Sequence, residues 1–193
     1  MEGTIVNSLE NSAMKIESIQ IDDSSPLFNR RAMFYKEFPS DLRQLKFFSS
    51  LIMQKVPESI KGKNLLEKQI RELLKNAIKH GNKNDRTRKV KIYYAFNQEE
   101  AHIIIEDEGK GFREIEEWNE FYRKRCECYI KQQFDEMDKY VSFRTASSDA
   151  EDNGSSLCEA IKFWNGGIVF NNRRNVVAVL KKYPQKMHGI TIK

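Results

Sequence analysis

One amphipathic stretch, KQIRELLKNAIKHGN at residues 68–82, constrains the fold more than any other part of the sequence. An α-helix turns by about 100° per residue, so apolar residues three and four positions apart share a face. Six residues gather in this way into one arc that must face a core: Leu66, Ile70, Leu73, Leu74, Ala77 and Ile78. We place Lys68, Lys75 and Lys79 on the opposite side, where we expect them to face water. The pattern predicts a helix over residues 63–79.

The same helix carries three polar residues along one border of its apolar arc. Glu72, Asn76 and His80 are spaced four residues apart, which brings them into a single stripe. A carboxylate can accept a proton from a nucleophile. A neutral amide oxygen is a hard ligand that suits Mg²⁺, a cation that keeps several waters and takes few protein ligands. The stripe is therefore a candidate site for a cation and a water. The alternative is an ordinary polar helix flank, with His80 packing or capping the helix.

A second stretch, IIIEDEGKGF at residues 103–112, is an apolar strand that ends in an acidic turn with glycines at alternate positions. Asp107 stands at the strand end, where its carboxylate can accept a hydrogen bond from an exocyclic amine. Gly109 and Gly111 permit backbone torsions that are closed to other residues, and they let a ligand approach the main chain. Taken alone, this spacing is also typical of an ordinary turn.

Together, ELLKNAIKHG at residues 72–81 and DEGKGF at residues 107–112 resemble the N-box and the first glycine box of the GHKL ATPase and kinase superfamily. The short length and the NAIKHG form are most similar to the anti-sigma-factor serine/threonine kinases of bacterial partner-switching systems. The resemblance covers about residues 31–182. Its specificity lies in two motifs that occur in the expected order at a plausible separation.

The resemblance implies a site for ATP and Mg²⁺ and assigns a role to each motif residue. Asn76 would hold Mg²⁺, which bridges the phosphates, and Glu72 would be the catalytic base that accepts the proton of an attacking hydroxyl. Asp107 would bind the adenine amine. Gly109 and Gly111 would let the backbone turn at the start of the nucleotide lid.

The family's second glycine box corresponds to Gly154, Ser155 and Ser156, which the resemblance places against the phosphates. The family usually has G-x-G here, whereas this chain has Ser156 in place of the second glycine. Serine adds a side chain where the backbone would approach phosphate, although its hydroxyl can donate a hydrogen bond. Ser156 and Glu159 also form a capping-box pattern at the start of a helix, whose free N–H groups favour phosphate.

The order of predicted elements indicates an α+β two-layer sandwich, with helices on one face of a mixed, mostly antiparallel sheet. We expect a loosely attached N-terminal extension at residues 1–30, the GHKL-like domain at 31–182 and a basic C-terminal tail at 183–193. Within the domain we expect a helical insertion at about 113–141 and a lid at about 142–154. Apart from the helix described above, a helix is predicted from Ser40-Asp41 to Pro57 and a further one after Gly154. The predicted strands are residues 31–38, 90–96, 101–106, 167–170 and 176–180.

The insertion has no counterpart in the compact form of the family. Its helical pattern carries a largely aromatic and apolar stripe: Ile115, Trp118, Tyr122, Cys126, Tyr129, Phe134, Met137 and Val141. We expect this stripe to pack against the parent domain, and the alternative is a binding surface.

Composition limits the environment and the partners. No apolar run approaches the roughly 20 residues of a membrane span, the first residues do not resemble a signal peptide, and an odd number of cysteines favours a reducing cytoplasm. The basic spots at residues 86–91 and 173–174 lack the pattern of a nucleic-acid-binding motif, so we expect no direct contact with nucleic acid.

The resemblance implies a serine/threonine protein kinase whose partners are a sigma factor and a small anti-anti-sigma protein substrate, and it allows a homodimer. One alternative is a degenerate, non-catalytic nucleotide-binding module that uses the insertion to hold partners. Another is a GHKL regulatory ATPase domain of a different type.

Overall fold

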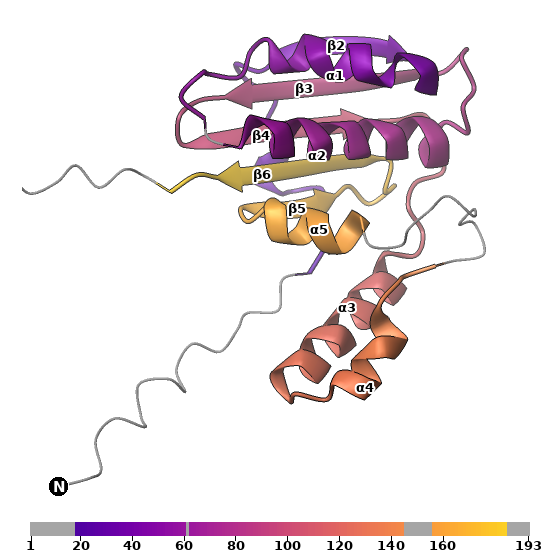
Figure 1. Cartoon of the computed structure of the whole chain (residues 1–193). Coiled ribbons are helices and arrows are strands. Elements are labelled where there is room, and N and C mark those ends of the chain that lie inside the picture. The colour runs from indigo at the N-terminus through magenta and orange to yellow at the C-terminus, as the bar shows by residue number, and fades with distance from the viewer. Residues whose placement is uncertain (1–17, 61, 145–155, 185–193) are drawn as a thin grey trace, which may run out of the picture.

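The computed structural model describes residues 18–60, 62–144 and 156–184, which form an α+β fold built on one sheet (Figure 1). All neighbouring strands pair antiparallel except β1 and β5, which are parallel. The expectation of a mixed, mostly antiparallel sheet is therefore confirmed. The six strands lie in the order β1-β5-β6-β4-β3-β2, with these bounds: β1 (Gln20–Ile21), β2 (Phe34–Pro39), β3 (Lys89–Phe96), β4 (Glu100–Glu106), β5 (Gly167–Phe170) and β6 (Val176–Lys182).

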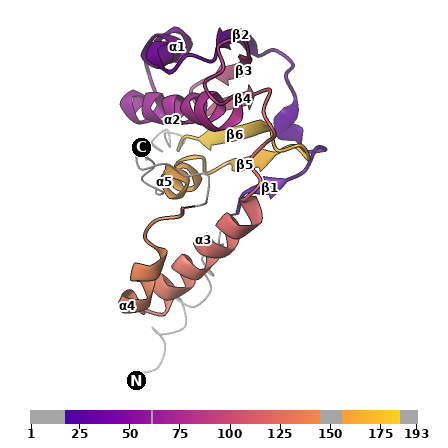
Figure 2. The same cartoon turned by 90° about the vertical axis from the view of Figure 1, so that its right-hand side faces the viewer.

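A layer of helices covers one face of the sheet, as two perpendicular views show (Figures 1 and 2). Successive side chains of a strand point to opposite faces, so Ile103 and Ile105 of β4 join the core beneath the helices while Ile104 packs on the other face. Ile70 and Leu74 meet this core from above and are fully buried. Burial of each such side chain stabilises the fold by roughly 1.5–3 kcal/mol. The layer consists of α1 (Leu45–Met53), α2 (Lys63–Asn76) and α5 (Ser156–Phe163).

Most strand boundaries agree with the sequence prediction to within two residues. The first predicted strand, residues 31–38, instead begins at Phe34, because Ala32 adopts a left-handed backbone (φ 62°) in a preceding turn. The helix predicted from Ser40-Asp41 begins as a 3-10 turn at Leu42–Gln44, where the Asp41 carboxylate accepts a hydrogen bond from the N–H of Arg43.

The N-terminal segment corrects one expectation, because residues 18–30 belong to the fold. β1 adds a parallel edge strand beside β5, and the neighbouring Ile19 is only 2% exposed. Leu27 and Phe28, in the 3-10 turn Pro26–Phe28, pack against the sheet face opposite the helices. The sequence prediction of a loose attachment is therefore wrong for this segment, while residues 1–17 lie outside the described part of the chain.

The predicted insertion is a helical hairpin that projects away from the sheet (Figure 1). It consists of α3 (Ile115–Ile130), a short α4 (Phe134–Met137) and a 3-10 turn at Asp138–Tyr140. The side chain of Asn119 on α3 donates to the carbonyl of Ile19 at 2.8 Å and accepts from its N–H at 2.9 Å, which ties the base of the hairpin to the N-terminal segment. None of the helices in the described residues is both long and apolar enough to span a membrane.

Candidate functional site

A pocket of about 900 Å³ lies between α2, α5 and the turn that follows β4. Apolar side chains on the helix-facing side of the sheet contribute to its walls, among them Ile105, Ile168 and Val177. Phe143, at the start of the predicted lid, also lines it, and its ring lies 5.4 Å from that of Phe121 on α3. The insertion therefore contacts one wall of the pocket. The rest of the predicted lid, residues 145–154, lies outside the described residues.

Most of the site residues predicted from the sequence meet in this pocket. Gly154 and Ser155 lie outside the described residues. The others all line the pocket: Glu72, Asn76, Asp107, Gly109, Gly111 and Ser156. The structure thus brings together side chains from α2, the β4 turn and α5, while the role of each remains a prediction.

The end of the predicted helix differs from a uniform α-helix. α2 ends at Asn76 and continues as a π-helical turn, Ala77–Gly81, in which the Asn82 N–H donates to the Ala77 carbonyl at 2.8 Å. A π turn takes one extra residue per hydrogen bond and is frequent at functional sites. Here it places Ala77, His80 and Gly81 on the pocket wall together with Asn76. Periodicity at 100° per residue does not reveal this widening.

A buried amide, that of Asn82, fastens the helix end to the turn after β4. Its Oδ1 accepts a hydrogen bond from the Glu108 N–H at 2.7 Å, and its Nδ2 donates to the Ser40 hydroxyl at 2.8 Å and to the Lys89 carbonyl at 2.9 Å. Asn82 is 0% exposed, so these bonds satisfy polar groups that would otherwise be costly to bury. The sequence pattern does not predict this role for Asn82. The only signal was an asparagine directly after the glycine that ends the helix.

Asp107 is held in a narrow space between the helix end and its own turn. Its Oδ1 accepts a hydrogen bond from the Gly109 N–H at 2.8 Å. A methyl group at Gly81 would lie 2.4 Å from the Asp107 Cγ, so only glycine leaves room for the carboxylate there. Burial raises the pKa of Asp107 to about 6, and the Gly109 hydrogen bond and the charge of Arg88 only partly oppose this rise. A desolvated carboxylate of this kind gains from a ligand amine that donates to it.

The polar side-chain atoms of Glu72 and Asn76 have no hydrogen-bond partner among the described residues. Within residues 18–60, 62–144 and 156–184, neither side chain takes part in a hydrogen bond or an ion pair with the protein. The same residues include no group of three or more His, Cys, Asp or Glu side chains able to hold a metal ion. A divalent cation in this pocket would therefore take Asn76 as a ligand and complete its shell with water and ligand oxygens, an arrangement that suits Mg²⁺.

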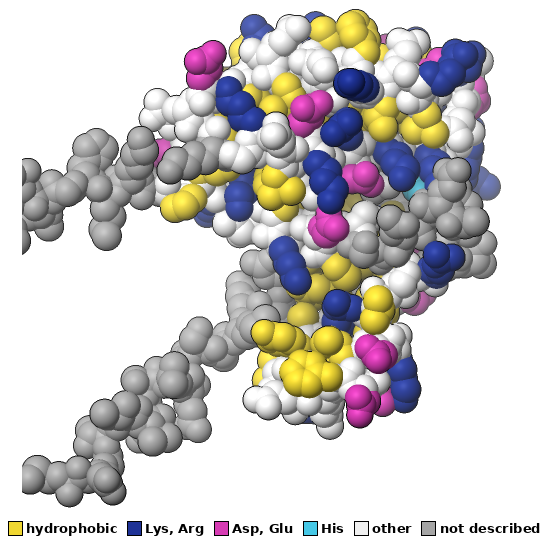
Figure 3. All heavy atoms as spheres, viewed as in Figure 1, with side chains coloured by type: hydrophobic (Ala, Val, Ile, Leu, Met, Phe, Trp, Pro, Cys, Tyr) yellow, Lys and Arg dark blue, Asp and Glu magenta, His cyan; other side chains and the backbone are white. Residues whose placement is uncertain are grey.

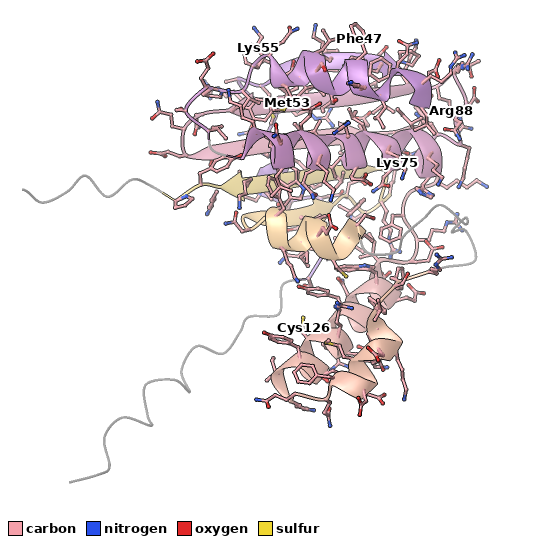
Figure 4. The ribbon with its side chains drawn as sticks, in the orientation of Figure 1. Phe47, Met53, Lys55, Lys75, Arg88 and Cys126 are labelled. Atoms are coloured by element: carbon pink, nitrogen blue, oxygen red, sulfur yellow. The ribbon has the colours of Figure 1, made fainter. Side chains whose placement is uncertain are left out.

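The pocket wall carries more positive than negative charge, which favours an anionic ligand. Among the described residues, seven Lys and Arg side chains line it against five Asp and Glu side chains. Figure 4 labels two of the cations, Lys75 on α2 and Arg88 before β3, on the same side of the molecule. The full set of cations is Lys68, Lys75, Lys83, Arg88, Lys110, Arg113 and Arg174.

Two of these cations, Lys68 and Lys75, lie on the side of α2 opposite its apolar arc, which was predicted to face water. Lys68 is indeed exposed, and both residues line the pocket. Lys68 stands one turn before Glu72, and four residues advance a helix by only about 40° beyond a full turn, so the two share a flank. The Lys68 Nζ donates to the Glu159 Oε2 at 2.7 Å, which joins α2 to α5.

Comparison with known proteins adds no family assignment: no protein-family model matches the chain, and no curated protein matches it significantly. The functional interpretation therefore depends on the geometry of the pocket.

Proposed function

We propose that this protein is a GHKL-type serine/threonine kinase that binds Mg-ATP, holds a sigma factor and phosphorylates a small anti-anti-sigma protein. One observation supports the proposal above all others. Glu72, Asn76 and Asp107 come from two separate segments of the chain, and all three line one pocket with a cationic wall. The pocket is large enough for a nucleotide, since ligand pockets commonly measure about 300–1,000 Å³.

In the proposed reaction, Glu72 accepts the proton of a Ser or Thr hydroxyl on the partner protein. The hydroxyl oxygen forms a bond to the γ-phosphorus of ATP while the bond from that phosphorus to the departing ADP oxygen breaks. Asp107 binds the adenine amine, and Asn76 would hold Mg²⁺, which would neutralise phosphate charge. Phosphoryl transfer depends chiefly on positioning and charge neutralisation, and the pocket supplies groups for both.

A second candidate is a non-catalytic nucleotide-binding module that acts by holding partner proteins. The observation in its favour is the projecting hairpin, whose tip leaves Tyr129, Ile130 and Phe134 each more than half exposed. Hydrophobic side chains gather there on the surface (Figure 3). The two candidates differ in whether the bound nucleotide is consumed.

The first test is titration of the full chain with a fluorescent ATP analogue, with and without Mg²⁺. We expect the wild-type protein to bind more tightly with Mg²⁺, and Asn76→Ala to lose about tenfold or more of that metal-dependent affinity, because the amide is the proposed protein ligand. Asn64→Ala is the matched control, since Asn64 is exposed on the same helix and does not line the pocket. Undiminished metal-dependent binding in Asn76→Ala would remove Asn76 from this role.

The second arm separates the two candidates. Glu72→Gln should still bind the analogue but should transfer labelled γ-phosphate to proteins of the native lysate at least about 100-fold more slowly than wild type, because a positioned base contributes that much. Transfer that persists in Glu72→Gln would disprove the assignment of the base. Nucleotide binding without any transfer by the wild-type chain would favour the non-catalytic module.

A further inference from the structure

The ion pair between Lys68 and Glu159 joins two helices at the wall of the pocket. Lys68 comes from α2 and Glu159 from the first turn of α5, and their charged atoms lie 2.7 Å apart. Both residues also line the pocket, and both side chains are about half exposed (52% and 50%). Exposed ion pairs contribute little to stability, so this one can be exchanged for another partner at small cost.

Lys68 is placed where the proposed reaction concentrates negative charge. It precedes Glu72, the proposed base, by one helical turn and Asn76, the proposed metal ligand, by two turns on the same flank. The hydrogen bond to Glu159 first, then the charge of Glu159 and that of Glu72, raise the pKa of Lys68, as expected for an ammonium group near both carboxylates. Ser156, which stands where the family has its second phosphate-facing glycine, lies one turn before Glu159 on α5.

We propose that Lys68 binds the terminal phosphate of the nucleotide, and that Glu159 competes with that phosphate for it. The inference rests on the proposed nucleotide site and identifies a residue that distinguishes ATP from ADP within it. The terminal phosphate of ATP carries more negative charge than a carboxylate, and a lysine ammonium on a flexible stem can move between the two. Its charge assists phosphate binding on the side of the pocket where Ser156 replaces glycine.

The test measures ATP and ADP affinities of the full chain in Mg²⁺, by displacement of the fluorescent analogue. We expect Lys68→Met to weaken ATP binding about tenfold, the loss expected for one charge-assisted hydrogen bond, and to leave ADP binding nearly unchanged. Glu159→Gln should instead strengthen ATP binding severalfold, because it releases Lys68. Lys162→Met is the control for charge, since Lys162 is exposed on α5 and does not line the pocket.

The double variant Lys68→Met/Glu159→Gln shows whether Glu159 acts through Lys68. If it does, the double variant binds ATP as weakly as Lys68→Met. Thermal melting of each variant checks that the fold is retained. Equal losses of ATP and ADP affinity in Lys68→Met, or weaker ATP binding in Glu159→Gln, would overturn the inference. If the wild-type chain binds no nucleotide, the proposed function itself fails, whereas normal binding by wild type and all variants overturns only the role of Lys68.

Discussion

The two long helices, α2 and α3, have similar lengths and similar sequence periodicity but different surroundings. On α2 the apolar residues Leu66, Ile70 and Leu74 are all 0% exposed. On α3 the apolar stripe begins equally buried at Trp118 (0%) and ends at Tyr129, which is 58% exposed. Periodicity therefore predicts where the apolar face of a helix lies, whereas the remainder of the fold decides how much of that face is covered.

The difference follows from the direction of each helix. α2 lies over the sheet, roughly along the direction of its strands, so its apolar face is covered along its length (Figure 1). α3 leaves the sheet after its first turns and is accompanied beyond them by the short α4. The expectation that the stripe packs against the parent domain is confirmed for the half near the sheet, and it is wrong for the tip.

The largest effect that tests this comparison comes from two aromatic truncations within α3. Trp118→Ala removes a fully buried ring that stacks on Tyr122 at 5.1 Å, and should lower the free energy of unfolding by about 3–5 kcal/mol. Tyr129→Ala, in the same stripe, should change it by only about 0.5 kcal/mol or less. Urea denaturation followed by circular dichroism measures both. A large loss of unfolding free energy in Tyr129→Ala would mean that the tip of the helical hairpin is covered in solution.

An intermediate effect is expected at the turn that joins the pocket to the hairpin. Gly111 has a positive φ of 81°, and a methyl group there would lie 2.2 Å from the Arg173 carbonyl oxygen. Gly62 has a similar φ of 77° with open space around it, so Gly62→Ala reports the backbone strain alone. We expect Gly62→Ala to cost about 1 kcal/mol and Gly111→Ala at least about 2 kcal/mol, because the clash adds to the strain.

Urea denaturation of the two glycine variants supplies the comparison. Equal costs would show that the backbone beside Arg173 yields freely, and that the hairpin is less firmly joined to the pocket than the structure indicates.

The smallest effect is a difference in pH dependence between the two regions. The pKa of Asp107 is raised by burial from 3.8 to about 6, so the folded state binds its proton more tightly than the unfolded state. Its contribution to the free energy of unfolding is therefore greatest below pH 4 and falls as the pH rises to about 6, by about 1 kcal/mol once its partial exposure is taken into account. The hydrogen bond from Arg123 lowers the pKa of Glu120 on α3, so its contribution has the opposite sign and is lost as the pH falls.

Unfolding of wild type, Asp107→Asn and Glu120→Gln between pH 4 and pH 7.5 separates these contributions. Relative to Asp107→Asn, the wild type should lose stability with rising pH. Relative to Glu120→Gln, the wild type should become slightly more stable as the pH rises. If the free-energy difference from wild type changed with pH in the same direction for both variants, the pocket would not hold the only desolvated carboxylate of the pair.

Much of the sheet could be predicted because its strands carry local signals. β3 and β4 combine apolar residues with a short polar loop, and β5 and β6 flank a loop rich in asparagine and arginine. The candidate site could be predicted for a different reason: most of its residues fall in two short motifs, so a pattern spanning ten residues fixes several of them together.

What could not be predicted depends on contacts between distant segments. β1 has only two residues, and its pairing depends on the edge that β5 offers it, which the local sequence does not specify. The ion pair of Lys68 could not be predicted either, because its partner Glu159 comes from α5, a distant part of the sequence. The π turn at Ala77–Gly81 and the buried amide of Asn82 likewise depend on how the helix end meets the β4 turn.

The close packing of Gly81 on the Asp107 carboxylate has a consequence for how this protein can vary in evolution. Because a single added carbon at position 81 would overlap the acid, position 81 cannot gain a side chain while Asp107 is retained. Any homologue with a larger residue at the first position should have lost the acid at the second, and with it the group proposed to recognise adenine. Paired change at these two positions would mark lineages that have lost the proposed recognition of adenine.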